Sequence, residues 1–372
     1  MDDMQYMRLA LALAEKGCGF VNPNPMVGAL LVKDDRIIGQ GYHKSYGGLH
    51  AERNALLNCV EPTQGATMYV TLEPCCHHGK TPPCTDAIIK SGIQRVVIGS
   101  LDPNPLVSGK GIEILRRHGI KVIERVLQDA CNKLNEVFFH FITGKKPYVV
   151  MKYAMTMDGK IATRSGKSKW ITGEFARERV HKDRHRYSAI MVGVGTIIAD
   201  DSMLTCRLPD FKSPIRIICD TQLRTPLQAN VVQTAKQYRT IIATCCTDHP
   251  KAQAYQEAGC ELLIVPSKDG HVDLAALMLA LGKEGIDSIL LEGGQTLNWS
   301  ALNNGIVNKV QTYIGPKVFG GIHAKSPIGG LGISSPSGAY QLSPPLVTLL
   351  GDDILLESEV IGCLQESLRK SE

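Results

Sequence analysis

Hydrophobic and polar positions in the first 140 residues alternate between the period of a helix and the period of a strand. Apolar positions at helical spacing predict helices at 4–16, after His50, at 86–91 and at 112–118. Shorter β-rich runs predict strands at 67–72, 95–99 and 121–126. The apolar run from Met26 to Gly41, broken at Asp34-Asp35, predicts a hairpin. This order of elements is typical of an α/β sandwich.

A second series of strands and helices begins after residue 147. Its apolar runs predict strands at 148–154, 189–194, 215–219, 240–243, 262–265, 289–291 and 310–314. The helical patterns between them lie mainly at 174–187, 251–258 and 274–282. This alternation favours a mostly parallel sheet flanked by helices. The stretch 320–345, rich in Gly, Ser and Pro, predicts a long loop before one last strand at 346–356.

A short polar stretch with Gly and Pro, at 143–147, separates the two series. The chain has 372 residues, which is long enough for two or three domains. We therefore expect an N-terminal domain at 1–145 and a C-terminal domain at 146–372.

The composition predicts folded, globular material throughout, with 44% hydrophobic and 21% charged residues. No apolar run approaches the ~18 residues of a membrane-spanning helix. The start of the chain carries Asp2, Asp3 and Glu15 around its apolar positions, which is typical of an amphipathic helix and not of an export signal. The 12 cysteines are therefore expected to be reduced thiols, some of them metal ligands, in a cytoplasmic protein.

Net charge gives little indication of a polyanionic partner, because 41 basic residues face 36 acidic ones. The basic residues are concentrated between Lys152 and Arg186, where ten Lys and Arg accompany only four Asp and Glu. Such a cluster is either a solvated helix face or a site for a few phosphate groups. We expect neither a nucleic-acid partner nor a membrane partner.

Soft metal ligands are dense in the first half. His50-Ala51-Glu52 starts one predicted helix, and the segment 74–84 contains Cys75, Cys76, His77, His78 and Cys84. One imidazole and two thiolates suit a catalytic zinc whose fourth position stays open, with a nearby carboxylate that moves protons. His-x-Glu followed by Pro-Cys-x-x-Cys is typical of nucleobase deaminases. Here the second cysteine lies nine positions after Cys75, at Cys84, instead of three.

Spacing alone does not choose among these five potential ligands for two positions. A structural zinc site closed by four ligands, and a loop without metal, are the two alternatives. Paired Cys-x-x-Cys knuckles, which structural sites usually have, are missing here. A structural site would also give Glu52 no reason to stand two residues after a ligand.

These motifs resemble the bifunctional riboflavin-biosynthesis deaminase–reductase family, over essentially the whole chain. In that family the longer cysteine spacing is the rule. The resemblance implies a cytidine-deaminase-like α/β/α sandwich with zinc held by His50, Cys75 and Cys84 and with Glu52 as general acid and base. Cys76 and His78 then stand outside the ligand set. The implied contacts to the substrate's base and ribose phosphate are Asn24, His43, His77, Lys80, Asp102 and Asn104. The Asn-Pro and Asp-Pro pairs among them are also typical of plain turns.

The second half lacks Gly-x-Gly-x-x-Gly after its first strand, so the usual dinucleotide fingerprint is absent. Glycines follow two other predicted strands, at 192–196 and 291–297. They either leave backbone N–H groups open to a phosphate at a helix start or serve packing alone.

The stretch 152–162 and the turn at Glu292-Gly293-Gly294 resemble the reductase half of the same family, which is similar in fold to dihydrofolate reductase and uses NADPH. Cofactor contacts implied by the resemblance are Ala154, Trp170, Thr196, Asp200, Thr221, Gly294, Gln295, Thr296, Leu297, Asn298, Trp299 and Ser300. Substrate contacts implied are Ser168, Arg184, Leu204, Arg207 and Glu292, with Arg184 and Arg207 as phosphate clamps.

The family resemblance implies two reactions on a phosphorylated pyrimidine: zinc-dependent deamination, then NADPH-dependent reduction of the ribosyl side chain. Lys152 and Asp200 are the expected proton donors in the reduction, with Glu292 third; Lys152 could instead be an exposed lysine at a strand end. Association into a homo-oligomer through the reductase half is also implied. A nucleic-acid deaminase with an RNA-binding second half is disfavoured by 5% aromatic residues. A scaffold that has lost catalysis is disfavoured because both motif sets are complete.

Overall fold

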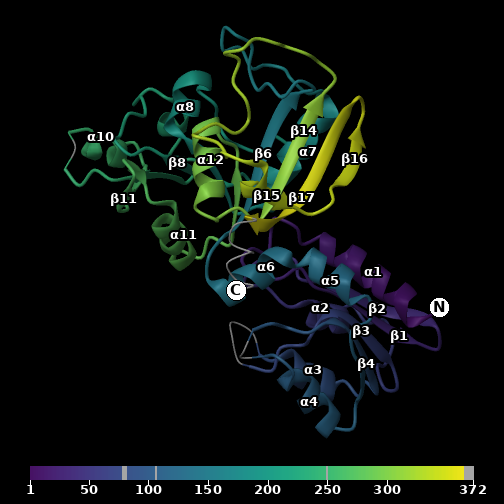
Figure 1. The fold of residues 1–372 in the computed structure, drawn as a ribbon. Helices are drawn as coiled ribbons and strands as arrows, with labels where there is room; N and C mark the ends of the chain where they lie inside the picture. Colours follow the sequence, from purple (N-terminus) through teal and green to yellow (C-terminus); the bar gives the residue numbers. More distant parts are fainter. Residues whose placement is uncertain (78–81, 105–106, 249, 364–372) are drawn as a thin grey trace. The chain divides into compact units, whose positions relative to one another are not determined.

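The computed structural model describes residues 1–77, 82–104, 107–248 and 250–363 (Figure 1). The chain divides into two compact units, Met1–Lys145 and Lys146–Glu372. None of the helices in these described ranges combines the length and the apolar character that a membrane crossing requires.

The first unit is built on a five-stranded sheet in the order β2-β1-β3-β4-β5. Its strands are β1 Gly28–Lys33, β2 Arg36–Tyr42, β3 Thr67–Leu72, β4 Arg95–Ser100 and β5 Lys121–Ile123. Its helices are α1 Asp3–Glu15, α2 Ala51–Leu57, α3 Cys84–Lys90, α4 Lys110–Arg117, α5 Gln128–Leu134 and α6 Glu136–Gly144. Strands β3, β4 and β5 run parallel, and β1 pairs antiparallel with both β2 and β3.

Apolar side chains cover both faces of this sheet. One face packs against α2, α3 and α4 through Ala55, Ile88 and Leu115. The other face packs against α1 and α5 through Met7 and Cys131. The expected α/β/α sandwich is therefore confirmed. The hairpin between β1 and β2 turns where it was predicted, because Asp34 and Asp35 both adopt the positive φ of a type I′ turn.

The second unit contains a ten-stranded sheet in the order β10-β9-β8-β7-β13-β6-β14-β17-β15, with β16 also paired to β17. Its strands are β6 Tyr148–Thr156, β7 Ala189–Gly193, β8 Ile215–Cys219, β9 Thr240–Thr244, β10 Glu261–Ile264, β13 Ser288–Leu291, β14 Lys309–Gly315, β15 Tyr340–Leu342, β16 Leu346–Leu350 and β17 Asp353–Cys363. A separate short hairpin is formed by β11 Ser267–Lys268 and β12 His271–Val272. Strands from β10 to β14 in this order are parallel, which confirms a mostly parallel sheet.

Helices flank both faces of the second sheet. They are α7 Glu174–Arg186, α8 Val194–Asp200, α9 Asn230–Gln233, α10 Ala252–Glu257, α11 Leu274–Lys283 and α12 Gln295–Asn303. Leu277 and Leu302, from α11 and α12, pack on one face. Ile197 and Tyr255, from α8 and α10, pack on the other. Because the strands are parallel, their carboxyl ends meet at one edge of the sheet, and the glycine-containing turns lie there.

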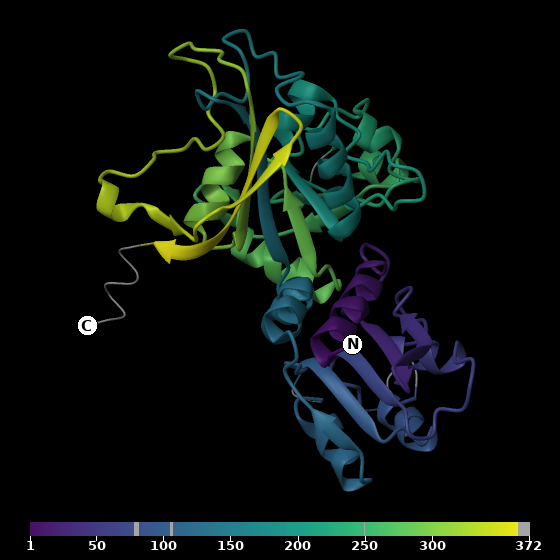
Figure 2. The same ribbon diagram turned by 90° about the vertical axis from the view of Figure 1, so that its right-hand side faces the viewer.

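The end of the chain differs from its prediction. The single strand predicted at 346–356 is wrong: it is an antiparallel hairpin of β16 and β17, drawn in yellow in Figure 2. Gly351, with φ of 65°, forms the turn that the apolar pattern concealed. The predicted loop before it also contains β15 and a short 3-10 helix, Pro336–Gly338. In the first unit, β5 is three residues long, shorter than predicted.

Candidate active sites

His50, Cys75 and Cys84 converge in the first unit. His50 Nδ1 lies 3.5 Å from Cys75 Sγ and 3.4 Å from Cys84 Sγ, and the three ligand atoms lie within 4.8 Å of one another. A tetrahedral zinc with bonds of about 2.3 Å to sulfur and about 2.1 Å to nitrogen separates N from S by about 3.6 Å. The side chains therefore fit a zinc ion with three protein ligands.

Element ends bring the three ligands together. His50 immediately precedes α2, Cys75 follows β3, and Cys84 is the first residue of α3. Arg53 fixes the chain before Cys84, because its guanidinium donates to the carbonyls of Pro82 (3.2 Å) and Pro83 (2.9 Å). These bonds hold Cys84 close to His50 although nine positions separate it from Cys75.

The two thiols share a hydrogen bond that favours one thiolate. Hydrogen bonding from Cys84 and His50 lowers the pKa of Cys75 to about 4. The same bond, together with burial, raises the pKa of Cys84. One sulfur is thus already anionic, and binding of a metal would displace the proton of the other.

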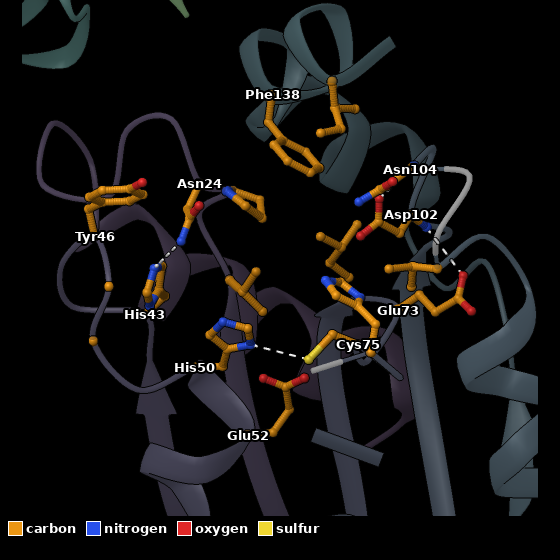
Figure 3. Close-up of a pocket in the computed structure, with 18 residues that line it drawn as sticks. Asn24, His43, Tyr46, His50, Glu52, Glu73, Cys75, Asp102, Asn104 and Phe138 are labelled. Atoms are coloured by element: carbon orange, nitrogen blue, oxygen red, sulfur yellow. Dashed lines mark hydrogen bonds between the residues drawn. The ribbon is translucent and has the colours of Figure 1, made fainter. Parts of the chain in front are cut away.

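Glu52 lies beside this triad and is only 3% exposed. Burial raises the pKa of its carboxyl, so its proton is held more tightly than that of an ordinary glutamate. Figure 3 shows Glu52, His50 and Cys75 at the floor of one cavity, with Asn24 and His43 on one side and Asp102 and Asn104 on the other. A carboxyl in this position can both accept and return a proton.

His43 fixes the orientation of Asn24. Its Nδ1 must donate to the carbonyl of Leu49, 3.0 Å away, which leaves Nε2 to accept from the amide of Asn24 at 3.2 Å. Burial lowers the pKa of His43, consistent with a neutral ring. The amide oxygen of Asn24 remains able to accept a hydrogen bond from a ligand.

Glu73 anchors the opposite wall. Its buried carboxylate accepts backbone N–H groups of Asp102 (3.4 Å), Gly109 (3.0 Å), Gly111 (3.1 Å) and Ile112 (3.4 Å). These bonds tie the start of α4 to the end of β3. Burial raises the pKa of neighbouring Asp102 to about 6.

The cavity above the triad measures about 290 Å³. The predicted residues that line it are Asn24, His43, His50, Glu52, Cys75, His77, Asp102 and Asn104. Cys84 is fully buried beneath them. Lys80 and His78 lie outside the described residues. Tyr46, Glu73 and Phe138 also line the cavity, although the sequence analysis did not identify them.

A larger cavity of about 540 Å³ lies in the second unit. Predicted residues that line it are Ser168, Thr196, Asp200, Thr221, Glu292, Gly294, Gln295, Thr296, Leu297 and Ser300. The turns after β7 and β13 meet there, because Gly193 N donates to the carbonyl of Gly293 at 2.8 Å. A side chain at Gly195 would project into open space. These turns leave room and backbone donors for the phosphates of a dinucleotide.

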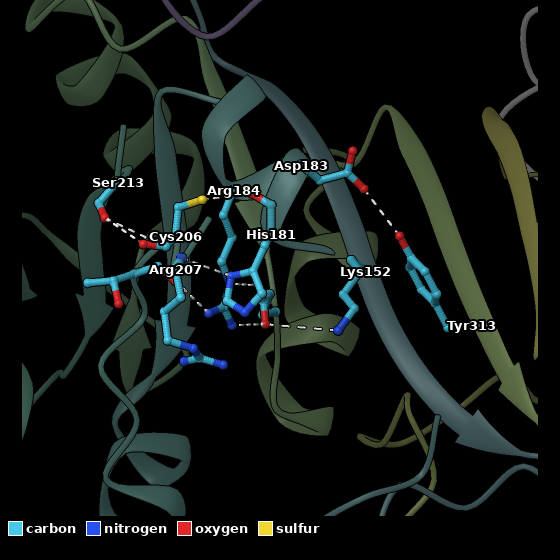
Figure 4. A network of polar contacts seen from close by, with 10 residues as sticks. Lys152, His181, Asp183, Arg184, Cys206, Arg207, Ser213 and Tyr313 are labelled. Carbon is cyan, nitrogen blue, oxygen red and sulfur yellow. Dashed lines mark hydrogen bonds and ion pairs between the residues drawn. The ribbon is translucent and has the colours of Figure 1, made fainter. Parts of the chain in front are cut away.

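Strand register brings Lys152 to Glu292. Met151 of β6 pairs with Leu291 of β13, so the residues that follow them, Lys152 and Glu292, are neighbours. Lys152 Nζ lies 4.0 Å from Glu292 Oε2, and Figure 4 shows Lys152 among His181, Arg184 and Tyr313. Arg184 of α7 forms two hydrogen bonds with the same carboxylate, at 2.8 and 2.9 Å.

Burial and neighbouring charges shift the pKa values of the titratable side chains in this cluster. Burial lowers the pKa of Lys152, although Glu292 opposes the shift. Burial alone would raise the pKa of Glu292, but the charges of Arg184 and Lys152 lower it to about 2. Burial and the charges of Arg184 and Arg207 lower the pKa of His181 to about 4. A carboxylate and a cation of reduced proton affinity therefore stand side by side.

Further polar side chains surround Lys152 and Arg184. Its Nζ lies 5.5 Å from the centre of the Tyr313 ring, and the Tyr313 hydroxyl donates to Asp183 at 3.2 Å. His181, one turn before Arg184, accepts the backbone N–H of Arg207 at 3.3 Å. The sequence analysis did not identify His181, Tyr313 or Asp183, because their roles depend on contacts between distant elements.

Comparison with known proteins matches both units to described families. Residues 147–356 match the RibD C-terminal domain, and residues 1–100 match the zinc-binding region of cytidine and deoxycytidylate deaminases. Riboflavin biosynthesis protein RibD of Actinobacillus pleuropneumoniae is 56% identical over 98% of this chain and 97% of its own length. RibD of Aquifex aeolicus is 44% identical over 95% and 97%.

The chain belongs to the RibD family.

Solved structures of RibD proteins agree. A diaminohydroxyphosphoribosylaminopyrimidine deaminase/5-amino-6-(5-phosphoribosylamino)uracil reductase from Thermotoga maritima has 40% identity and a TM-score of 0.84, covering 96% of this chain and 98% of that one. Acinetobacter baumannii RibD has 35% identity and a TM-score of 0.86 over the same shares. The chain is a bifunctional deaminase and reductase of riboflavin biosynthesis, with a zinc-binding deaminase domain and an NADPH-using reductase domain.

Several residues predicted from the RibD resemblance lie away from the lining of the larger cavity. The Leu204 side chain is packed in the core, and Asn298 is buried with its amide on the Pro327 carbonyl. Trp170 is 58% exposed and stacks beneath Arg177. The other predicted residues outside the lining are Lys152, Ala154, Arg184, Arg207 and Trp299.

Proposed function

We propose that this RibD-family chain deaminates 2,5-diamino-6-ribosylamino-4(3H)-pyrimidinone 5′-phosphate and then reduces the ribosyl side chain to ribityl. The product is 5-amino-6-ribitylamino-uracil 5′-phosphate. The observation that carries the proposal is Glu52 beside the His50, Cys75 and Cys84 triad at the floor of a cavity. The description of the Thermotoga maritima relative names the same two kinds of reaction.

In the first reaction, Glu52 is the group that moves protons. His50, Cys75 and Cys84 would hold a zinc ion, which would supply activation of the attacking water near neutral pH. Glu52 accepts a proton from the attacking water and returns protons to the ring nitrogen and to the leaving amine. The C2–amine bond breaks, a C2 carbonyl forms, and ammonia leaves.

The walls of the deaminase cavity orient the pyrimidine. Asn24, held by His43, offers an amide oxygen to a ring N–H. Asp102 and Asn104 line the opposite wall, with Asp102 accepting the Asn104 N–H at 2.8 Å. His77 also lines this cavity and contributes a further polar group to the ligand. We assign these residues to substrate binding.

In the second reaction, Lys152 and Glu292 handle the proton. The C1′–O bond of the ribosylamine breaks as the ring oxygen takes a proton, which leaves an iminium at C1′. Bound NADPH would supply the hydride that reduces this carbon. We assign the proton donation to Lys152, because burial lowers the pKa of its amine, whereas, against the effect of burial, Glu292 raises the pKa of the neighbouring Arg184 guanidinium. Asp200 lines the same cavity as Glu292 but has no described contact with Lys152, so we assign it to cofactor binding.

Arg184 and Arg207 take different roles in this proposal. Both edges of the Arg184 fork are occupied, by Glu292 and by the Thr205 carbonyl at 3.0 Å. Arg184 therefore orients Glu292 and keeps little donor capacity for a phosphate. Arg207 is exposed and is the better phosphate ligand of the two. The cofactor's pyrophosphate binds at Gly294 and Gln295, at the start of α12.

The experiment that tests the proposal separates the two activities. Glu52→Gln should abolish ammonia release but leave NADPH oxidation intact when the deaminated compound is supplied. The matched control is Glu113→Gln, which removes a surface carboxylate of the same unit. Loss of both activities in a folded protein would overturn the two-site assignment. Oxidation of NADPH by Glu52→Gln with the diamino compound would overturn the order of reactions.

Two further expectations accompany this function. We infer assembly of a homo-oligomer through the reductase unit, which size-exclusion chromatography with light scattering would test. We also infer a cytoplasmic location, testable by fractionation.

A further inference from the structure

A tight turn follows β8 at the edge of the reductase cavity. Asp220 accepts the backbone N–H and the hydroxyl of Thr225, both at 2.7 Å, so one buried carboxylate oxygen closes the turn. Leu223 within it has φ of 52° and a buried side chain. Asp220 thus imposes a fixed shape on 220–225.

Two contacts support this turn from outside. The buried hydroxyl of Tyr255, from α10, lies 3.2 Å from the Leu223 carbonyl and also bonds to the Thr225 carbonyl. Thr221 Oγ1 accepts the backbone N–H of Val272 at 3.3 Å, which ties the turn to β12. The position of the intervening Arg224 backbone is therefore fixed from several sides.

Arg224 is the residue that this turn presents to the cavity. It lines the cavity, and within the described part of the chain its guanidinium has no hydrogen-bond or ion-pair partner. Other basic lining residues are His271 and Lys325. A guanidinium left without a carboxylate at the wall of a ligand cavity is suited to a ligand phosphate.

The order of strands indicates which part of the cofactor reaches Arg224. Lys152 lies in β6 and Glu292 follows β13, where the proposed function puts hydride transfer, and the start of α12 comes next after β13. Strand β8 lies two positions beyond β13 in the sheet, about 10 Å away. A dinucleotide with its nicotinamide at Glu292 and its pyrophosphate at α12 therefore extends its adenosine toward β8.

The same end of the cavity has an apolar wall. Val272 and Leu274 line it and are almost fully buried. An adenine ring can pack against these side chains while its ribose faces the turn after β8. Asp200 is at the end of α8, which follows β7, so it lies nearer the centre of the sheet than the turn after β8. Its carboxylate would favour a free ribose hydroxyl over a phosphate.

We propose that Arg224 binds the 2′-phosphate of NADPH and sets the preference for NADPH over NADH. This inference rests on the proposed function, because it takes the hydride to be transferred at Lys152 and Glu292. The planar guanidinium matches the geometry of the phosphate oxygens. NADH has a neutral 2′-hydroxyl in place of this phosphate and therefore offers Arg224 no negative charge. Arg224 acts here as a specificity-determining residue.

The test measures binding of the adenosine end without hydride transfer. Titration calorimetry on the full chain compares adenosine 2′,5′-bisphosphate with 5′-AMP. Arg224→Gln should weaken the bisphosphate about 10- to 100-fold, the range for lost charge-assisted hydrogen bonds, and change 5′-AMP affinity by less than about two-fold. Arg224→Lys should lose less, because it keeps the charge without the fork.

Arg239→Gln is the matched control, because it removes one positive charge at the opposite end of β9. It should leave the preference for the bisphosphate unchanged. The ratio of kcat/KM for NADPH to that for NADH should fall in Arg224→Gln in proportion to the binding loss. Equal weakening of the binding of both nucleotides, or a retained preference for the bisphosphate, would overturn the role of Arg224 but not the proposed function. Wild-type protein that binds neither nucleotide would overturn the cofactor placement in the proposed function as well.

Discussion

The two catalytic units organise their charges in opposite ways. The deaminase cavity, about 290 Å³, gathers polar side chains from five short segments around a set of three metal ligands. The reductase cavity, about 540 Å³, is bordered by a largely buried lysine, carboxylate and guanidinium that come from β6, the end of β13 and α7, respectively. In the first unit a metal can supply the charge that the reaction needs. In the second unit the protein supplies it through an ion cluster of two cations and one carboxylate.

This difference indicates which changes should impair the activity of each unit. A metal site depends on a few ligands, so its loss removes one activity without disturbing the sheet that holds it. A buried ion cluster depends on mutual compensation, because removing one charge leaves the others uncompensated in a place poor in water. Changes in the two units should therefore have distinct signatures.

Zinc removal should give the largest and most selective effect. Treating the full chain with a chelator should abolish ammonia release, because His50, Cys75 and Cys84 would lose their common ion. NADPH oxidation with the deaminated compound should persist. The first unit should also melt at a lower temperature, because metal binding free energy stabilises the fold that presents the ligands. Parallel assays and calorimetry measure these effects.

Restored ammonia release on adding zinc back is the control for that experiment. A chelator that stops NADPH oxidation with the deaminated compound, in protein that remains folded, would contradict the separation of the two sites.

Lys152→Met should produce the next largest effect, confined to reduction. Methionine fills a similar volume but cannot donate a proton, so the reduction rate should fall about 10²- to 10⁴-fold. Ammonia release should be unchanged. Single-turnover NADPH oxidation with the deaminated compound measures the loss. Lys309→Met, which removes another lysine near a tyrosine ring in the same sheet, is the control. A rate within a factor of two of wild type would exclude Lys152 as the proton donor.

The contrast between the units also explains how much the sequence could predict. His50, Glu52, Cys75 and Cys84 lie within one stretch, and their residue types alone restrict the chemistry. Helix and strand periods likewise predicted most of both sheets, but not the short strand β15 or the turn at Gly351 that folds the last strand back on itself. Local patterns suffice where local chemistry is distinctive.

Residues whose role depends on strand register could not be predicted in the same way. The sequence favoured Lys152 and Asp200 over Glu292 as proton donors, and only the pairing of Met151 with Leu291 brings Glu292 to Lys152. Arg224 and Glu73 were missed because an arginine or a glutamate after a strand has no distinctive spacing. Their roles follow from a closed turn and from the amides of a distant helix start.

Arg53→Lys should have a moderate effect that tests how the metal site tolerates its long cysteine spacing. Lysine keeps the charge but cannot span the carbonyls of Pro82 and Pro83, so Cys84 should be held less firmly. Zinc affinity should fall about 10-fold, at the low end for residues that support metal ligands. Competition with a chelating dye measures it. Arg36→Lys, a surface ion pair in the same unit, is the control, and equal loss in both variants would contradict the role of Arg53.

The smallest expected effect is a shift in the pH dependence of reduction, and its sign tests the compensation within the ion cluster. Reduction that needs protonated Lys152 is present below the pKa of that amine and is lost as pH rises through it. Burial lowers this pKa, and the charge of Glu292 raises it, so Glu292→Gln should move the alkaline limb to lower pH. Glu292 itself, with a pKa of about 2, should contribute no acid limb in the working range. Single-turnover rates against pH measure the limb for both proteins. A limb that moves to higher pH, or stays in place, would show that Lys152 does not carry the titrating proton. The charges of the reductase cluster would then not set the protonation of the catalytic group, and the contrast with the deaminase site would be smaller.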